Sequence, residues 1–258
     1  MPKCSIVFLM YHELQIAGRP LCQPEPGYAR YVVPEPDFRA QMNYLKATGW
    51  QGLSVGQALG FPEGRNVAIT FDDGSETDLL AAAPILRQAG FNATFFITCG
   101  RLGKPGYLSS AQLKELSEQG FEIGCHSMTH PYLTDLDQSG LRHEICDAKS
   151  QLEQIIDRPV QHFSCPGGRY DQRVVSMARA AGYRTVANSR IQANSRKTDV
   201  FALGRVAILR DVPLPTLAAV CAGISLSRMR AQSVFRRAAR QILGNSFYDR
   251  LRAALLHR

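Results

Sequence analysis

The sequence lacks an apolar run of the length that a membrane-spanning helix requires. Such a helix needs roughly 20 predominantly apolar residues, and the longest apolar stretches here, residues 5–11 and 79–86, are far shorter. The first of these runs ends at His12-Glu13, too early for the core of a signal peptide and its cleavage site. We therefore interpret it as a buried strand and expect a cytoplasmic protein.

Low-complexity tracts, fixed-period repeats and Cys-x-x-Cys pairs are also missing. The cysteines are odd in number and scattered, at positions 4, 22, 99, 125, 146, 165 and 221. This pattern argues against a disulfide framework and against a structural zinc knuckle, and scattered reduced thiols suit a cytoplasmic protein.

What is present is a chain of 258 residues with 45% hydrophobic content, enough to bury one sizeable core. The net charge of +8 is unevenly placed. Residues 226–258 hold eight arginines and one acid, Asp249, and so carry nearly all of the excess. We therefore divide the chain into a domain, residues 1–225, and a basic amphipathic helical tail, residues 226–258.

Short β-rich segments alternate with stretches that have apolar residues at helical spacing. The expected strands are residues 5–10, 67–71, 93–98, 121–125, 161–164, 184–187 and 202–208. The expected helices are residues 36–48, 78–89, 109–119, 137–156 and 172–181. This alternation predicts an α/β fold with a mainly parallel sheet, either open or closed into a barrel.

Candidate site residues follow four of these strands, where the active sites of α/β folds lie. They are His12, the pair Asp72-Asp73, His126 and the run from Pro166 to Gly168. Because the carboxyl ends of parallel strands meet at one edge, we expect these residues to form one site.

The adjacent acids Asp72 and Asp73 repel each other, so they stay ionised only beside a cation or another compensating partner. One carboxylate can then hold a metal while the other acts as a base. The alternative is a solvated turn, because Asp73-Gly74 is a common turn dipeptide. A haloacid-dehalogenase-type phosphatase would require Asp-x-Asp instead.

His126 and His130 have the spacing at which two imidazoles can converge on one ion. No glutamate follows His126, which excludes the zinc-protease motif, and Pro131 favours a loop over a helix. With Asp73 they form a two-histidine, one-carboxylate set that leaves metal positions open for water and a substrate carbonyl.

At this point the residues resemble a known family. Thr70-Phe-Asp-Asp-Gly74, His126-Ser-x-x-His130 and Phe163-Ser-x-Pro166-x-Gly168 look like the first three motifs of polysaccharide deacetylases, carbohydrate esterase family 4, over roughly residues 5–210. The resemblance implies a distorted (β/α) barrel of the NodB-homology type. It also implies that Asp72 is the general base, with the metal on Asp73, His126 and His130. The divalent metal would be Zn²⁺, with Co²⁺ and Ni²⁺ as alternatives.

The third motif implies a substrate groove. Pro166, Gly167 and Gly168 would shape it, and the amide of Gly167 would be an oxyanion donor. Arg169 and Tyr170 follow directly. They would bind a sugar or a phosphate, or simply begin the next helix.

Three departures from the family are visible. Ser164 stands where the family usually has an arginine that contacts the base. The tryptophan of the fourth motif has no counterpart near it, since the only tryptophan is Trp50. The late general-acid histidine is missing, because no histidine follows His162 until His257.

The general acid must therefore come from elsewhere or be absent. Leu9-Met10-Tyr11-His12 resembles the opening motif of the permuted subgroup, which includes bacterial poly-N-acetylglucosamine deacetylases of exopolysaccharide biosynthesis. The resemblance makes His12 the acid; the alternative is a structural histidine at a strand end.

We expect a metal-dependent N-deacetylase of a polysaccharide or lipid-linked glycan. Two alternatives stay open: a hydrolase of another amide or of an O-acetyl ester, and a weakened member that binds carbohydrate. The tail would either contact anionic lipid at the inner membrane face or pack on the domain; a nucleic-acid partner is less favoured.

Overall fold

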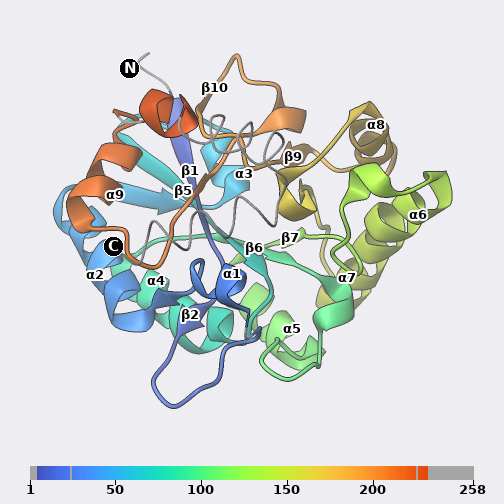
Figure 1. The fold of residues 1–258 in the computed structure, drawn as a ribbon, viewed down its shortest axis with the longest axis horizontal. Coiled ribbons are helices and arrows are strands. Elements are labelled where there is room, and N and C mark those ends of the chain that lie inside the picture. Colours follow the sequence, from blue (N-terminus) through green and yellow to red (C-terminus); the bar gives the residue numbers. More distant parts are fainter. Residues whose placement is uncertain (1–4, 24, 225, 232–258) are drawn as a thin grey trace, which may run out of the picture.

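A computed structural model describes residues 5–23, 25–224 and 226–231 of the protein (Figure 1). Its strands are β1 (Ser5–Tyr11), β2 (Leu14–Gln15), β3 (Val33–Pro34), β4 (Trp50–Leu53), β5 (Arg65–Asp73), β6 (Thr94–Ile97), β7 (Glu122–Cys125), β8 (His162–Ser164), β9 (Thr185–Ala187), β10 (Ala193–Ser195) and β11 (Val206–Ala207). Its α-helices are α1 (Pro26–Ala29), α2 (Glu35–Ala47), α3 (Val55–Ala58), α4 (Ala83–Ala89), α5 (Ser110–Glu118), α6 (Gln138–Arg142), α7 (Ala148–Ile156), α8 (Gln172–Ala180) and α9 (Leu214–Cys221).

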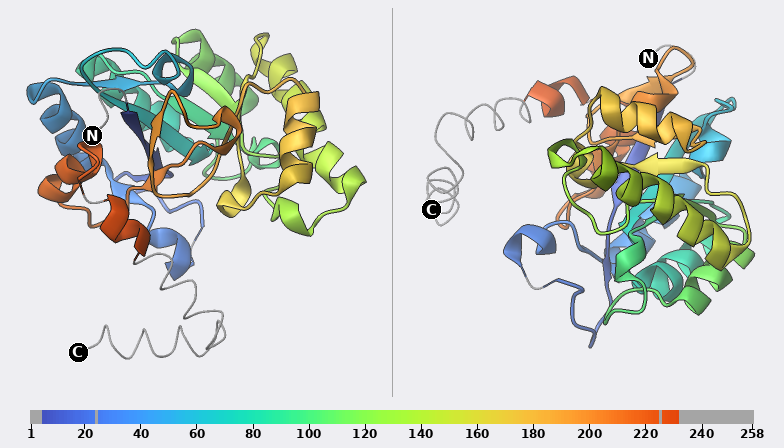
Figure 2. Two further views of the ribbon diagram at one scale, coloured as in Figure 1. Left: turned by 90° about the horizontal axis from the view of Figure 1, so that it is seen from above. Right: turned by 90° about the vertical axis from the view of Figure 1, so that its right-hand side faces the viewer.

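The sheet is mainly parallel and curled. Its order is β10-β1-β5-β6-β7-β8-β9, with β11 also paired to β1 and β4 to β5. Among the described strand pairs of this sheet, only β1–β10 is antiparallel. Helices surround this sheet (Figure 1). Figure 2 shows the arrangement from two other sides, with helices α6 and α8 next to each other. The strand–helix alternation of the sequence thus forms the mainly parallel α/β sheet that it predicts, and the curled sheet agrees with the distorted (β/α) barrel that the family resemblance implies.

The segment from Leu203 to Ile208 connects the two edges of the curled sheet. On one side Leu203 donates its N–H to Val186 of β9 and forms a bridge with Ala187. On the other side β11 pairs with β1, and Ile208 donates its N–H to Met10. This short connection closes the barrel and, as shown below, delivers a side chain to its interior.

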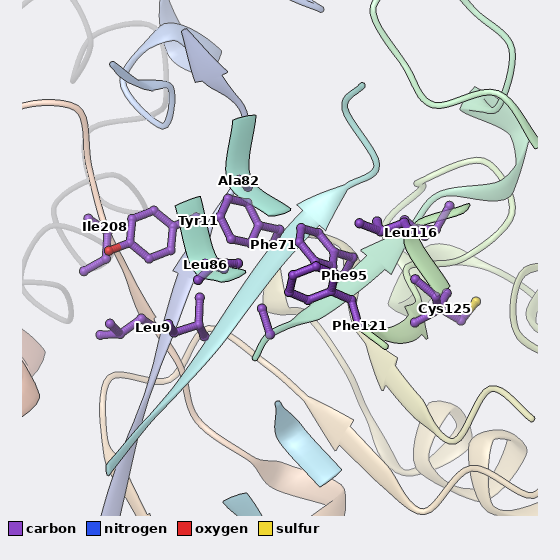
Figure 3. Close-up of a cluster of buried hydrophobic side chains, with 14 of the residues drawn as sticks. Leu9, Tyr11, Phe71, Ala82, Leu86, Phe95, Leu116, Phe121, Cys125 and Ile208 are labelled. Atoms are coloured by element: carbon purple, nitrogen blue, oxygen red, sulfur yellow. The ribbon is translucent and has the colours of Figure 1, made fainter. Parts of the chain in front are cut away.

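Alternate residues of the strands face two separate apolar clusters, because successive side chains of a strand point to opposite faces. Outward-facing rings form a row across β1, β5 and β6 under the helices (Figure 3). Tyr11 stacks on Phe71 with 5.3 Å between ring centroids, and Phe71 stacks on Phe95 at 5.0 Å. The inward faces form a smaller cluster that includes Phe8 and Phe96. The inward positions of the strand ends are therefore the ones that can line a site.

The predicted helices and strands are largely confirmed. A π-helical turn, Asp78–Ala82, opens the helix that continues as α4, and a second, His143–Asp147, joins α6 to α7. Of the predicted strand 202–208, only β11 is regular. The segment between β1 and α2 contains only the short pieces β2, α1 and β3.

The first six residues of the predicted tail, 226–231, are helical, and Leu226 is buried in the core with Met229 packed against it. These six residues agree with the alternative in which the tail packs on the domain. The remaining tail, residues 232–258, lies outside the described residues, so its contact with anionic lipid stays a prediction. Within the described ranges, no helix combines the length and the apolar character needed to cross a membrane.

Candidate active site

Asp72 and His126 reach the site through the ordinary alternation of their strands. On β5, Asp72 has the same parity as Ala68, which belongs to the inner cluster. At the end of β7, His126 has the same parity as Gly124, where a Cβ would lie 2.4 Å from the inward-facing Phe96 ring. Both side chains are buried, Asp72 with 2% and His126 with 2% of its surface exposed. The sheet therefore places a carboxylate and an imidazole side by side in the barrel mouth.

Asp73 reaches the same site only because its backbone turns. Strand alternation alone would point its side chain to the helix-covered face with Phe71, but Asp73 has φ +84°. Ser127 and His130 are also left-handed, with φ +70° and +69°. Left-handed backbone is strained in residues other than glycine, and such strain often gathers at functional sites. Here the left-handed backbone turns the side chains of Asp73 and His130 toward the imidazole of His126.

The structure brings together the three predicted metal ligands. One ligand atom from each of Asp73, His126 and His130 lies within 4.8 Å of the others, and within the described part of the chain no other group of this kind occurs. Oδ1 of Asp73 is 3.8 Å from Nε2 of His126 and 3.5 Å from Nε2 of His130. Two ligands of one tetrahedral zinc ion lie about 3.3 Å apart, given metal–ligand bonds of about 2.0–2.1 Å.

The state of these ligand atoms also fits a metal. Oδ1 of Asp73 is buried and, within the described part of the chain, makes no aligned hydrogen bond, although Nη1 of Arg101 lies 2.6 Å away. Nδ1 of His126 is 2.8 Å from the carbonyl oxygen of Ser164, which favours a proton on Nδ1 and leaves Nε2 free to coordinate. Burial, and then the charge of His126, lower the pKa of His130 to about 4, so its imidazole is neutral at pH 7. The donor set therefore fits a divalent cation such as Zn²⁺, Co²⁺ or Ni²⁺.

Glu144 holds the loop between the two histidines, and the sequence did not reveal it. Its Oε2 accepts the N–H groups of Met128 (2.9 Å) and Thr129 (2.8 Å), and its Oε1 accepts the Thr129 hydroxyl (2.6 Å). The hydroxyl of Ser127 accepts the N–H of His130 at 3.0 Å. A buried glutamate on the π-helical turn thus fixes the strained backbone that presents His130.

Arg205 is the second residue that the sequence did not reveal, and it corrects one expectation. The prediction that Ser164 leaves the base without an arginine is wrong. Nη1 of Arg205 lies 2.7 Å from Oδ1 of Asp72, and Nη2 lies 2.8 Å from Oδ2. Nη2 also donates to the Ser164 hydroxyl at 2.6 Å. The barrel-closing segment therefore supplies the guanidinium, and the small side chain of Ser164 leaves room for it.

This ion pair decides the charge of Asp72. Burial, the largest single influence, would by itself raise the pKa of the Asp72 carboxyl, and the charge of Arg205 is the largest influence in the opposite direction. His126 and the hydrogen bonds of Arg205 add to the effect and hold the pKa well below its usual range. Asp72 is therefore ionised at every pH at which the protein would work.

His12 joins the same site. Burial lowers the pKa of His12, and the charges of Asp73 and Asp72 act in the opposite direction. Its Nδ1 is buried and has no hydrogen-bond partner in the described part of the chain. Its ring lies against that of Tyr31, with 4.9 Å between centroids. The position fits a proton donor, and its role as the acid stays a prediction.

The predicted groove residues lie on a short turn, Pro166–Gly168, directly after β8. Gly167 has φ +60°, and a Cβ there would lie 2.6 Å from the ring of Tyr132, two residues after His130. The guanidinium of Arg169 lies 3.9 Å from the centre of that ring. Tyr170 instead packs against the core. Of the predicted pair, Arg169 thus lies beside the loop that carries the metal ligands, together with the half-exposed Tyr132.

The fold and the site define a class of protein: an α/β barrel whose mouth combines two histidines and one carboxylate, a set that can hold a metal ion, with a separate, buried, ionised carboxylate. This combination is typical of hydrolases.

The chain belongs to the polysaccharide deacetylase family, whose members are hydrolases that act on carbon–nitrogen bonds other than peptide bonds. Residues 60–186 match the family described as "Polysaccharide deacetylase". The chain is 30% identical over 210 residues to the Bacillus subtilis protein "Putative polysaccharide deacetylase YxkH", which covers 79% of this chain and 71% of the relative.

A second relative, the peptidoglycan-N-acetylglucosamine deacetylase of Bacillus cereus, is 36% identical over 121 residues. The match covers 46% of this chain and 54% of that protein, so the chain spans about half the length of this relative. Among solved structures, Streptococcus pyogenes deacetylase PplD is similar in fold, with a TM-score of 0.76, 24% identity, and coverage of 84% of this chain and 98% of PplD.

Proposed function

We propose that this protein is a metal-dependent N-deacetylase that removes acetyl groups from N-acetylated sugars of a glycan. The observation that carries the proposal is the pairing of two adjacent acids with different partners. Asp73 faces His126 and His130, whereas Asp72 is held ionised by Arg205. A metal set beside an independent base is what hydrolysis of an unactivated amide requires.

In this proposal, different residues carry out the separate steps of amide hydrolysis. A divalent ion held by Asp73, His126 and His130 would polarise the acetamide carbonyl and make bound water more acidic. Asp72 accepts a proton from the water as it attacks the acetyl carbon. The N–H of Gly167 would donate a hydrogen bond to the developing oxyanion. His12, when protonated, gives its proton to the departing nitrogen. The products are acetate and a free amine on the sugar.

An N-acetylated sugar is supported as the substrate by the family and by the site. The Bacillus cereus relative is named for N-acetylglucosamine in peptidoglycan. In this chain, the half-exposed ring of Tyr132 and the guanidinium of Arg169 stand beside the metal-ligand loop and offer a flat surface for a glycan. A weakened carbohydrate-binding member is less favoured, because the base, its arginine and all three metal ligands are in place.

The test is release of acetate from N-acetylglucosamine oligomers by chelator-treated protein, with Zn²⁺, Co²⁺ or Ni²⁺ added back. We expect metal-dependent release, and a rate lower by at least about 100-fold in Asp72→Asn, which keeps the size of the base but not its charge. The surface variant Asp37→Asn, on the outer face of α2, serves as the matched control. Metal binding without release from any glycan would contradict the proposal.

The role of His12 has its own test. We expect His12→Ala to lower the rate of acetate release by about 100-fold or more, the usual contribution of a general acid. Its metal affinity should stay close to that of the unchanged protein, because His12 is not among the three metal ligands. A His12→Ala protein with an undiminished rate would remove His12 from the mechanism.

A further inference from the structure

One oxygen atom of the site faces three groups. Oδ1 of Asp73 faces Nε2 of His126 and Nε2 of His130, and it also lies 2.6 Å from Nη1 of Arg101. The Arg101 side chain is 18% exposed, so this contact is largely shielded from water. The carboxylate oxygen that a metal would need is therefore also the oxygen that an arginine contacts.

The contact between Arg101 and Asp73 is an ion pair without the alignment of a hydrogen bond. Among the residues that the structure describes, neither Nη1 of Arg101 nor Oδ1 of Asp73 has a hydrogen-bond partner, although the two atoms are close. The base Asp72 is bound differently, because Arg205 meets both of its oxygens in aligned hydrogen bonds. The guanidinium of Arg101 thus compensates the charge of Asp73 but leaves the lone pairs of Oδ1 unsatisfied.

The backbone fixes where Arg101 begins. It ends the turn Cys99–Arg101 after β6, and this turn is bonded to the loop that carries the histidines. Cys99 donates its N–H to Ser127, and Gly100 donates to Met128 at 2.7 Å. A Cβ on Gly100 would lie 2.9 Å from that same Met128 oxygen, so only glycine allows the approach. Arg101 is therefore delivered to the metal ligands by the ligand loop itself.

A second position is within reach of the Arg101 guanidinium. Its carbon Cζ lies 5.3 Å from the centre of the Tyr107 ring, a distance at which a cation is attracted to the ring face. The hydroxyl of Tyr107 accepts a hydrogen bond from Gln23 at 3.1 Å, which fixes this ring. The side chain can thus give up Asp73 without losing all favourable contacts.

We propose that Arg101 is a built-in competitor of the metal ion for Asp73. An ion bound to Oδ1 at about 2.0–2.2 Å would lie within about 5 Å of Nη1 if Arg101 stayed in place. Two cations at that separation in a shielded site repel strongly. Metal binding must therefore displace the guanidinium toward Tyr107 and solvent, and this displacement lowers the affinity for the metal. The inference rests on the proposed function, since it takes Asp73, His126 and His130 as the ligands.

The experiment measures metal affinity rather than activity. Chelator-treated full-length protein is titrated with Co²⁺ by its visible absorption and with Zn²⁺ in competition with a chromogenic chelator. We expect Arg101→Gln to bind both ions about tenfold more tightly or better, because the competing charge is gone. In the absence of metal, the same variant should melt at a lower temperature, because Asp73 loses its compensating charge.

Two further variants serve as controls for this experiment. Arg101→Lys retains a positive charge at this position and should bind within about threefold of the unchanged protein. Arg39→Gln removes an exposed arginine that pairs with Glu35 on α2 and should leave the affinity unchanged. Circular dichroism checks that each variant is folded.

The outcomes separate the two proposals. Equal or weaker metal binding by Arg101→Gln would overturn the role of Arg101 and leave the metal site intact. No metal binding by any of the proteins would overturn both this role and the metal dependence of the proposed function. Tighter binding by Arg101→Gln without acetate release from any glycan would support the competition and contradict only the deacetylase activity.

Discussion

Asp72 and Asp73 are neighbours in the chain but have different partners, and the cause is one backbone angle. Strand alternation would send their side chains to opposite faces of the sheet, yet the left-handed φ of Asp73 brings both carboxylates to the same mouth. Two buried carboxylates so close together would not both ionise without compensation. Arg205 compensates Asp72, and Arg101 with the imidazoles surrounds Asp73.

Removal of the guanidinium that serves Asp72 should damage both catalysis and folding. Arg205→Gln leaves a buried carboxylate without its cation, which costs about 3–5 kcal/mol of unfolding free energy. It also raises the pKa of Asp72, so the acid limb of the pH–rate profile should move to higher pH, since a base works only when deprotonated. Acetate release against pH and urea denaturation measure the two effects.

A double variant provides the control. Arg205→Ser with Ser164→Arg returns the guanidinium from the strand end where the family usually has it, and fills the space that Arg205 leaves. We expect this protein to recover part of the activity and to move the acid limb back toward its original pH. If Arg205→Gln leaves the pH–rate profile unchanged, Arg205 does not act on the charge of the base.

At the scale of elements, the sequence predicted the parts that are long or periodic. Strands β5 to β9 and helices α2, α5, α7 and α8 follow from alternation and from i, i+3, i+4 spacing, and the candidate site residues lie at the ends of these strands. Elements whose apolar residues show no helical or strand periodicity were not predicted. Strand β4 is four residues long and includes Gly52, and helix α9 is apolar nearly throughout, so neither presents a periodic face.

The two supporting residues could not be found from local pattern for a different reason. Arg205 lies 133 positions from Asp72. Its short segment contains only the two-residue strand β11. Glu144 lies on a helix where a glutamate is the usual surface residue, and only the packing of that helix under the histidine loop buries it. Such contacts depend on tertiary structure, which a single sequence does not display.

The loop that carries His130 depends on the helix that carries Glu144. We expect Glu144→Gln to lower the affinity for Zn²⁺ by about 10–100-fold, the usual effect of losing a group that orients metal ligands. The amide of glutamine brings a donor toward the backbone N–H groups of Met128 and Thr129, so the strained loop relaxes. Chelator competition measures the affinity. Glu115→Gln, on the exposed face of α5, is the control and should bind Zn²⁺ as the unchanged protein does.

At the scale of the whole molecule, the site affects stability toward acid. The pKa of His130 is about 4 in the folded protein, below its ordinary value of about 6.5. The unfolded chain therefore binds a proton in this interval that the folded chain does not. The stabilisation linked to His130 is complete above about pH 6.5 and is lost as the pH falls through 4.

The measurement is urea denaturation of chelator-treated protein at pH 7 and pH 4.5, compared with His130→Gln. We expect the unchanged protein to lose about 1–2 kcal/mol more than the variant on acidification, allowing for partial exposure of the ring. The raised pKa values of Glu13 and Asp78, which burial causes, act with the opposite sign. They are common to both proteins and cancel in the difference. Equal losses would show that His130 titrates normally.

The predicted contact of the tail with lipid is also testable on the whole chain. Residues 232–258 contain six arginines and one aspartate. A chain that ends at residue 231 keeps Leu226 and Met229, which pack on the core. We expect the full chain to bind vesicles with anionic lipid at least about tenfold more strongly than this truncation, and to lose the advantage in high salt. Equal binding in a sedimentation assay would contradict the contact.

The position of the barrel-closing segment in the sequence also determines when Asp72 and Arg205 can pair during synthesis. During synthesis, Asp72 leaves the ribosome 133 residues before Arg205 does. Both aspartates, His126, His130 and the loop between these histidines are therefore made while the carboxylate of Asp72 still lacks the guanidinium of Arg205. Only the arrival of residues 203–208, which join β9 to β1, completes the pair. The Asp72–Arg205 ion pair can therefore form only after residues 1–204 have been synthesised.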